Sequence, residues 1–175
     1  AGLLDGVDTA GWNRAGIEDE HRFLLDLQAS EIPVCAPLAL PGGGTVGEQA
    51  GVCYGVWPRT GGREPDELSD DELRGLGRLL ARIHNVGAMK QPVDRPVLDA
   101  DTALLDPLDE LLDGTWLPPS CEERYATAVE SLADVYAERL EGVPLLRIHG
   151  DCHLGNLLRG REGWFFLDSY DFALG

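Results

Sequence analysis

The chain has 175 residues, enough for one domain or two small lobes that bury a core without disulfide or metal support. Its 31 acidic and 14 basic residues give a net charge of −17, which argues against binding nucleic acid or an anionic membrane because both attract basic surfaces. No apolar run is long enough for a membrane-spanning helix. The scattered cysteines and the lack of a signal peptide predict a reducing, cytoplasmic location.

The first predicted element is a helix over residues 13–29. One of its faces carries the apolar residues Ile17, Leu24 and Leu27. The acidic residues are expected largely on other faces: Glu18, Asp19 and Asp26.

Short extended segments follow this helix. Residues 38–40 are a strand candidate, residues 41–44 form a turn, and residues 52–57 are a stronger strand candidate. The glycine pair at 61–62 predicts a flexible joint. We therefore place a lobe boundary here and expect a first lobe over 1–58 and a second over 59–175.

The second half is predicted to be mainly helical. Ser69 and Glu72 have the spacing of a capping box, and Ser120 and Glu123 have it again. A short helix is predicted over residues 104–112. The first capped helix should bury Leu73, Leu76, Leu80 and Ile83. The second should carry one apolar stripe: Tyr125, Val129, Leu132, Val135, Tyr136 and Leu140.

The last thirty residues combine short strands with polar residues. An apolar run at 145–148 leads into the string HGDCHLGNLL at 149–158, and the turn 159–163 then predicts a hairpin. Asp151 and Asn156 lie on the loop before the hairpin, and Asp168 lies at the end of its second strand.

This order of residues suits phosphoryl transfer, in which one carboxylate accepts the proton of an attacking hydroxyl and oxygen ligands hold Mg²⁺ against ATP. The spacing Asp-x-x-x-x-Asn followed by a later Asp is that of protein kinases. We therefore predict Asp151 as the catalytic base, and Asn156 and Asp168 as metal ligands. His149 is expected to orient the loop by hydrogen bonding.

A metallohydrolase is an alternative, because His149, Asp151 and His153 alternate and would share one face of a strand. Such enzymes need further ligands in separate motifs. The remaining histidines, His21 and His84, each lie inside a predicted helix without a ligand-like neighbour.

The strings HGDCHLGNLL and FLDSYD resemble the signature of the aminoglycoside phosphotransferase/choline kinase superfamily, and most of all its stress response kinase A group. Weaker similarities extend the resemblance from about residue 12 to residue 171. They include DEHRF at 19–23, GVWP at 55–58 and RIH at 82–84.

The resemblance implies a protein-kinase-like bilobal α+β fold, with an incomplete N-lobe and a mainly helical C-lobe that contains the catalytic-loop hairpin. It implies ATP and Mg²⁺ as cofactors and a hydroxyl acceptor, either protein Ser/Thr or a small molecule of the aminoglycoside, choline or homoserine type. By resemblance, Glu20 would pair with an ATP-binding lysine. The adenine would contact the backbone of Val56, Trp57 and Pro58.

The sequence departs from the family pattern in three places. Lys90 is its only lysine and lies outside the position of the ATP-binding lysine, and no glycine-rich phosphate loop precedes the first helix. Tyr170 stands where the relatives carry a second acidic residue. These departures predict a phosphotransferase fragment truncated at both ends and inactive by itself, or alternatively a non-catalytic pseudokinase.

Overall fold

The computed structural model describes residues 13–114, 116–161, 163–167 and 173–175. The chain divides into two compact units. Unit 1 comprises residues 1–95 and 146–173, and unit 2 comprises residues 96–145 and 174–175. These units do not coincide with the boundary expected near residue 58, and the assignment of two kinase lobes stays a prediction.

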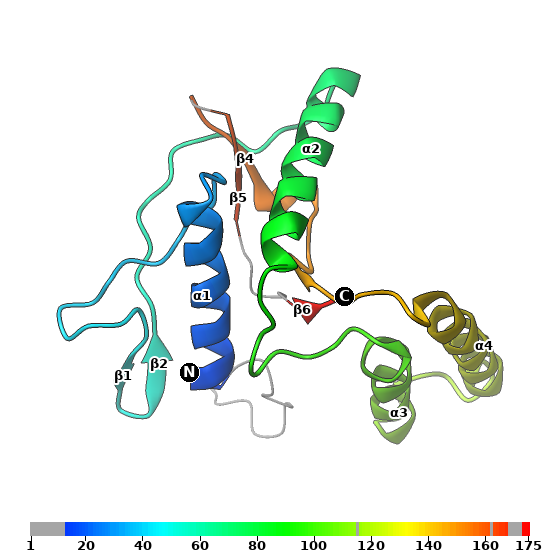
Figure 1. The fold of residues 1–175 in the computed structure, drawn as a ribbon. Coiled ribbons are helices and arrows are strands. Elements are labelled where there is room, and N and C mark those ends of the chain that lie inside the picture. Colours follow the sequence, from blue (N-terminus) through cyan, green and yellow to red (C-terminus); the bar gives the residue numbers. More distant parts are fainter. Residues whose placement is uncertain (1–12, 115, 162, 168–172) are drawn as a thin grey trace. The chain divides into compact units, whose positions relative to one another are not determined.

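Helices and short strands are interspersed along the chain, which confirms the predicted α+β class (Figure 1). The helices are α1 (Arg14–Ala29), α2 (Asp70–Gly87), α3 (Asp106–Asp113) and α4 (Glu122–Leu140). The strands are β1 (Gly47–Gln49), β2 (Val52–Tyr54), β3 (Arg147–Ile148), β4 (Leu157–Arg159), β5 (Trp164–Phe166) and β6 (Ala173–Leu174). A π-helical turn spans Asp101–Leu105, and a 3-10 turn spans Leu154–Asn156.

Helix α1 begins where the sequence predicts, because the Asn13 side chain accepts a hydrogen bond from the Gly16 amide at 2.8 Å. The burial of Asp19 was not expected, since its side chain is only 3% exposed. Its carboxylate accepts the main-chain N–H groups of Val93 and Asp94 at 2.6 and 2.5 Å. These hydrogen bonds offset the cost of removing the charge from water.

The predicted strand at 38–40 is wrong. Residues 38–40 form no strand, and the turn predicted at 41–44 follows them: the Leu40 amide donates to the Gly44 carbonyl, and Gly43 and Gly44 adopt positive φ angles. The strand that the sequence did not indicate is β1, which pairs with β2 in antiparallel register from Gly47↔Tyr54 to Gln49↔Val52.

Helix α2 begins with the predicted capping box. The Glu72 amide donates to Ser69 Oγ at 3.4 Å, and the Ser69 amide donates to Glu72 Oε2 at 3.0 Å. Leu76 and Ile83 are buried as expected, but Leu73 is 52% exposed. The apolar face of the helix therefore begins one turn later than the periodicity predicts.

The core of unit 1 joins α1, α2 and the predicted hairpin, which the structure confirms as β4–β5. Phe166 at the end of β5 is almost fully buried, and its amide donates to the Pro33 carbonyl at 3.2 Å. The buried residues of this core are Phe23, Leu24, Leu27, Ile32, Val34, Ala36, Leu76, Ile83, Val86, Leu157 and Phe166. The core therefore includes Phe166, the last residue of β5.

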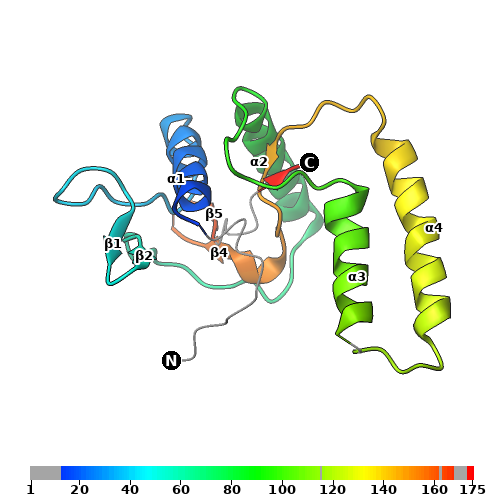
Figure 2. The same ribbon diagram turned by 90° about the horizontal axis from the view of Figure 1, so that it is seen from below.

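Unit 2 contains the π-helical turn, α3 and α4, and the two helices lie side by side (Figure 2). The capping box predicted at Ser120 is wrong, because α4 is capped at Cys121 without a side-chain hydrogen bond. The apolar stripe predicted on α4 lies along one face of the helix, but it is not uniformly buried. Its residues divide between an exposed set (Tyr125, Leu132, Val135) and a half-buried set (Val129, Tyr136, Leu140).

Candidate functional site

The loop between β3 and β4 brings Asp151 and Asn156 together. Asn156 is buried, and its Nδ2 amide donates to both the main-chain oxygen and Oδ2 of Asp151, each at 2.9 Å. Because the amide nitrogen faces Asp151, the oxygen Oδ1 is the atom of this side chain that can coordinate a cation. The roles of Asp151 as base and Asn156 as metal ligand stay predictions.

His153 is a second partner of Asp151, and the sequence assigned it a chemical role only in the metallohydrolase alternative. Its Nδ1 accepts the Gly155 amide at 3.0 Å, so the ring proton of the neutral form lies on Nε2, which is 3.2 Å from Asp151 Oδ2. A Cβ at Gly155 would lie 2.8 Å from the imidazole, so glycine is needed for this arrangement. The Asp-x-His spacing of residues 151–153 was the sequence signal that could have indicated this contact.

His149 orients the loop, as expected. Its Nε2 donates to the Leu167 carbonyl at 2.9 Å, and the Leu167 amide donates to the Asn156 carbonyl at 2.9 Å. Leu167 is thus held between the two ends of the loop. Asp168, the predicted main metal ligand, follows it in sequence but lies outside the described residues.

A cavity of about 550 Å³ lies against α1, β2 and the end of β5. Its lining includes Ile17, Glu20, Leu24, Cys35, Cys53, Tyr54, Gly55, Trp57, Phe166 and Leu167. The walls are mainly apolar and aromatic, with Glu20 as the only charged side chain among the described lining residues. Leu167 therefore links the cavity to the loop, because it lines the cavity and bonds to His149 and Asn156.

The predicted nucleotide contacts are only partly brought together. Glu20 and Trp57 line the cavity, whereas Val56 and Pro58 are not among the described lining residues. The Val56 carbonyl accepts the Leu38 amide at 2.7 Å, and the Pro58 carbonyl accepts the Cys35 thiol at 3.4 Å. The adenine contact proposed for these backbone groups stays a prediction.

Glu20 has a partner that the sequence did not indicate. Arg95 Nη2 lies 3.2 Å from Glu20 Oε2, and both side chains are largely buried. The only lysine of the sequence, Lys90, pairs instead with Asp26 at 2.6 Å. A buried arginine therefore contacts Glu20, and the predicted pairing of Glu20 with an ATP-binding lysine stays a prediction. No local pattern could have identified Arg95, which lies 75 positions away.

The ligand cluster of the metallohydrolase alternative is not formed by the described residues, among which no three His, Cys, Asp or Glu side chains converge to hold a metal. Its His149 is instead bonded to a main-chain carbonyl. Among the described residues, no helix is long and apolar enough to cross a bilayer.

The sequence matches the profile of the Phosphotransferase enzyme family over residues 7–175. The chain belongs to this family. The match includes the loop that carries Asp151 and Asn156, and the family predicted from the sequence is confirmed.

Curated relatives agree with the family. The chain is 35% identical over 161 residues to stress response kinase A of Escherichia coli K12. It is 33% identical over the same length to the serine/threonine protein kinase RdoA of Salmonella typhimurium. Each alignment covers 91% of this chain and 48% of the relative. The chain therefore spans about half the length of these relatives.

Solved structures of kinases share the fold of this family member. The amicoumacin kinase hAmiN, in complex with AMP-PNP, Ca²⁺ and Ami, superposes with a TM-score of 0.71 at 19% identity, covering 95% of this chain and 51% of that one. APH(2")-IIia, in complex with GDP and kanamycin, gives a TM-score of 0.60 at 17% identity, covering 93% of this chain and 60% of that one. The protein-kinase-like fold predicted from the sequence is confirmed.

Proposed function

We propose that this chain carries the catalytic loop and part of the nucleotide site of an ATP- and Mg²⁺-dependent kinase that phosphorylates serine or threonine hydroxyls in proteins. The observation that carries the proposal is the position of Leu167, which lines the cavity and bonds to both His149 and Asn156 of the loop. A nucleotide in the cavity would have the proposed base and metal ligand beside it.

The cavity suits a purine. Flat rings bind well between apolar and aromatic walls, and here Tyr54, Trp57 and Phe166 provide aromatic surface. Trp57 is held in place by His21, whose ring meets it edge-on at 5.2 Å between centroids. The similar fold of hAmiN, solved in complex with AMP-PNP, supports a nucleotide as the ligand.

The donor set of the loop suits Mg²⁺, which prefers oxygen ligands. Asn156 would contribute Oδ1, and Asp168 is proposed from the sequence as the carboxylate ligand. When bound, the cation would offset phosphate charge that a chain of net charge −17 would otherwise repel.

Asp151 is proposed to accept the proton of the acceptor hydroxyl. Its Oδ2 is held by Asn156 Nδ2 and faces His153 Nε2, so the carboxylate has a defined orientation. Its Oδ1 would accept the proton as the oxygen of the acceptor attacks the terminal phosphorus, while the bond from that phosphorus to the β,γ-bridging oxygen breaks and ADP leaves. The choice of a protein Ser/Thr acceptor follows the similarity to the curated kinases.

The test is phosphate transfer by the intact gene product that contains this sequence, with protein and small-molecule acceptors run side by side. Asp151→Asn should lower kcat by about 10²–10⁴-fold, the usual contribution of a general base, while nucleotide affinity changes little. Asp134→Asn, at an exposed carboxylate of α4, is the matched control and should keep full activity. Equal activity of the Asp151 variant and the parent would refute the assignment of the base.

A non-catalytic nucleotide-binding protein is the second candidate, and the Glu20–Arg95 pair favours it because the carboxylate contacts an arginine instead of a lysine. In that case Mg²⁺-ATP at a hundred times its Kd would still stabilise the intact protein by about 2.7 kcal/mol, without phosphate transfer to any acceptor.

A further inference from the structure

Arg147 at the start of β3 is a buried cation outside the proposed site. Its side chain is only 4% exposed, and its guanidinium lies over the Phe23 ring at 4.6 Å from the centroid. A charge removed from water in this way is stable only with good partners. The partners of Arg147 come from two helices.

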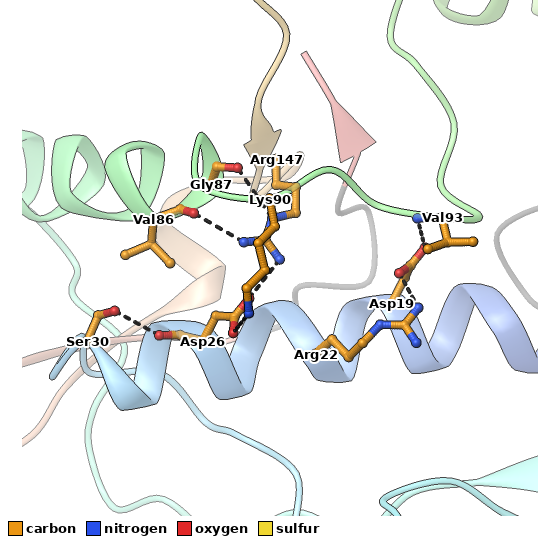
Figure 3. Close-up of polar contacts among 9 residues, drawn as sticks. All are labelled: Asp19, Arg22, Asp26, Ser30, Val86, Gly87, Lys90, Val93 and Arg147. Carbon is orange, nitrogen blue, oxygen red and sulfur yellow. Dashed lines mark hydrogen bonds and ion pairs between the residues drawn. The ribbon is translucent and has the colours of Figure 1, made fainter.

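The first partners are at the C-terminal end of α2. Arg147 Nε donates to the Gly87 carbonyl at 3.3 Å, and Nη2 donates to the Val86 carbonyl at 3.1 Å (Figure 3). The last carbonyls of a helix have no partner within the helix and carry its negative dipole end. An arginine can donate hydrogen bonds to these carbonyls, and its positive charge interacts favourably with the negative end of the helix dipole.

The second partner is Asp26 on α1. Arg147 Nη1 lies 3.0 Å from Asp26 Oδ2, and Lys90 Nζ lies 2.6 Å from Asp26 Oδ1 (Figure 3). Burial alone would raise the pKa of Asp26, but the hydrogen bonds from Lys90 and Arg147 lower it, so the carboxylate remains charged. One guanidinium thus joins α1, α2 and β3.

Arg147 lies shortly before the proposed catalytic loop in the sequence. Only three residues separate it from Asp151, and β3 leads directly into the loop. The main chain at Arg147 is also in close contact with α2, since a Cβ at Gly87 would lie 2.1 Å from the Arg147 carbonyl oxygen. The entry to the loop is therefore fixed by both the side chain and the backbone of one residue.

We propose that Arg147 is a positioning residue that holds the Asp151–Asn156 loop in register with α1, the helix that carries Glu20. The catalytic part of this proposal rests on the function proposed above. The Asp26–Arg147 pair sets the distance between the two sides of the site, and loss of the pair loosens the loop without removing any group that touches substrate.

The first test is hydrogen exchange on the intact gene product. In Arg147→Gln and in the milder Asp26→Asn, the loop amides of Gly155, Asn156 and Leu167 should exchange at least about tenfold faster. Amides in the middle of α1 should change much less. Arg147→Lys should restore part of the protection, because it keeps the charge next to Asp26.

The matched control is Arg82→Gln. Arg82 also joins α2 to the end of α1, through the Ser30 and Glu31 carbonyls at 3.2 and 3.1 Å, but it does not contact β3 in the described structure. In Arg82→Gln, the amides of Gly155, Asn156 and Leu167 should remain as protected as in the parent. Equal acceleration throughout unit 1, no acceleration in the loop, or the same effect in Arg82→Gln would each overturn the proposal.

The second test is kinetic. Arg147→Gln should lower kcat about 10–100-fold with little change in the KM for nucleotide, as expected for a displaced catalytic group. A raised KM with unchanged kcat would instead overturn the proposal. If the parent protein transfers no phosphate, the proposed function fails, but the exchange experiment still decides whether Arg147 orders the loop.

Discussion

Buried polar side chains are held in unit 1 by contacts that are distant in sequence. Asp19 accepts hydrogen bonds from amides 74 and 75 positions away, and Asp26 pairs with Arg147 across 121 positions. Helical periodicity compares a residue only with its neighbours on the same helix. Periodicity therefore placed both aspartates away from the apolar face of the helix. In the structure Asp19 is buried and Asp26 is half-buried.

His21 leads to a prediction about pH. It is 1% exposed, its Nδ1 lies 2.8 Å from Thr45 Oγ1, and its Nε2 has no hydrogen-bond partner among the described residues. Burial lowers its pKa below the ordinary value of 6.5, although the charge of Glu18 opposes this. The unfolded chain then binds a proton more readily, so the free energy of unfolding should fall as the pH drops below about 6.5.

Urea unfolding between pH 8 and pH 5 would measure this effect. His21→Gln should be less stable at pH 8 but should lose less stability on acidification than the parent. If both proteins lose the same amount, other groups are responsible for the pH dependence.

At the scale of an element, the starts of α2 and α4 show when a capping motif in the sequence predicts a cap in the structure. Ser69 and Ser120 have the same spacing to a glutamate, yet only Ser69 forms a capping box. Near Ser120, the Cys121 amide donates to the Pro118 carbonyl at 2.9 Å, so the chain turns before α4 begins. A capping motif needs the correct backbone approach as well as the correct residues.

Two glycines of α2 provide a matched pair of substitutions. A Cβ at Gly87 would clash with the main chain of Arg147, whereas a Cβ at Gly77 would meet nothing within 4 Å. Gly87→Ala should therefore lower the free energy of unfolding by about 1–3 kcal/mol, as overpacking does. Gly77→Ala should raise it by about 0.5–1 kcal/mol through helix propensity. Urea unfolding of both variants would test this, and two stabilised variants would contradict the close contact between α2 and β3.

The net charge of −17 dominates at the scale of the whole molecule. The exposed ion pairs, such as Arg14–Glu18 and Arg74–Asp71, contribute little because they are solvated. Repulsion among the excess carboxylates should therefore outweigh them.

Salt should consequently stabilise the chain. Raising NaCl from about 0.05 to about 0.5 M shortens the Debye length from roughly 14 to 4 Å and screens the repulsion. We expect the urea midpoint to rise at constant pH. A falling midpoint would mean that attractive ion pairs outweigh the excess negative charge.

The sequence by itself determined the features that depend on neighbouring residues: the extent of α1, the capping box of α2, the hairpin β4–β5 and the loop between Asp151 and Asn156. These features were predictable because helix periods, caps and turns are set within a few positions along the chain. The same loop indicated the family.

Only the tertiary structure decided which distant residues meet. Leu167 joins the cavity to the loop, Arg95 contacts Glu20, and Arg147 joins β3 to two helices. The division of the α4 stripe was likewise decided by packing. The physical reason is that these contacts depend on the chain folding back on itself, and no local pattern encodes which distant segments a buried charge or an apolar face will meet.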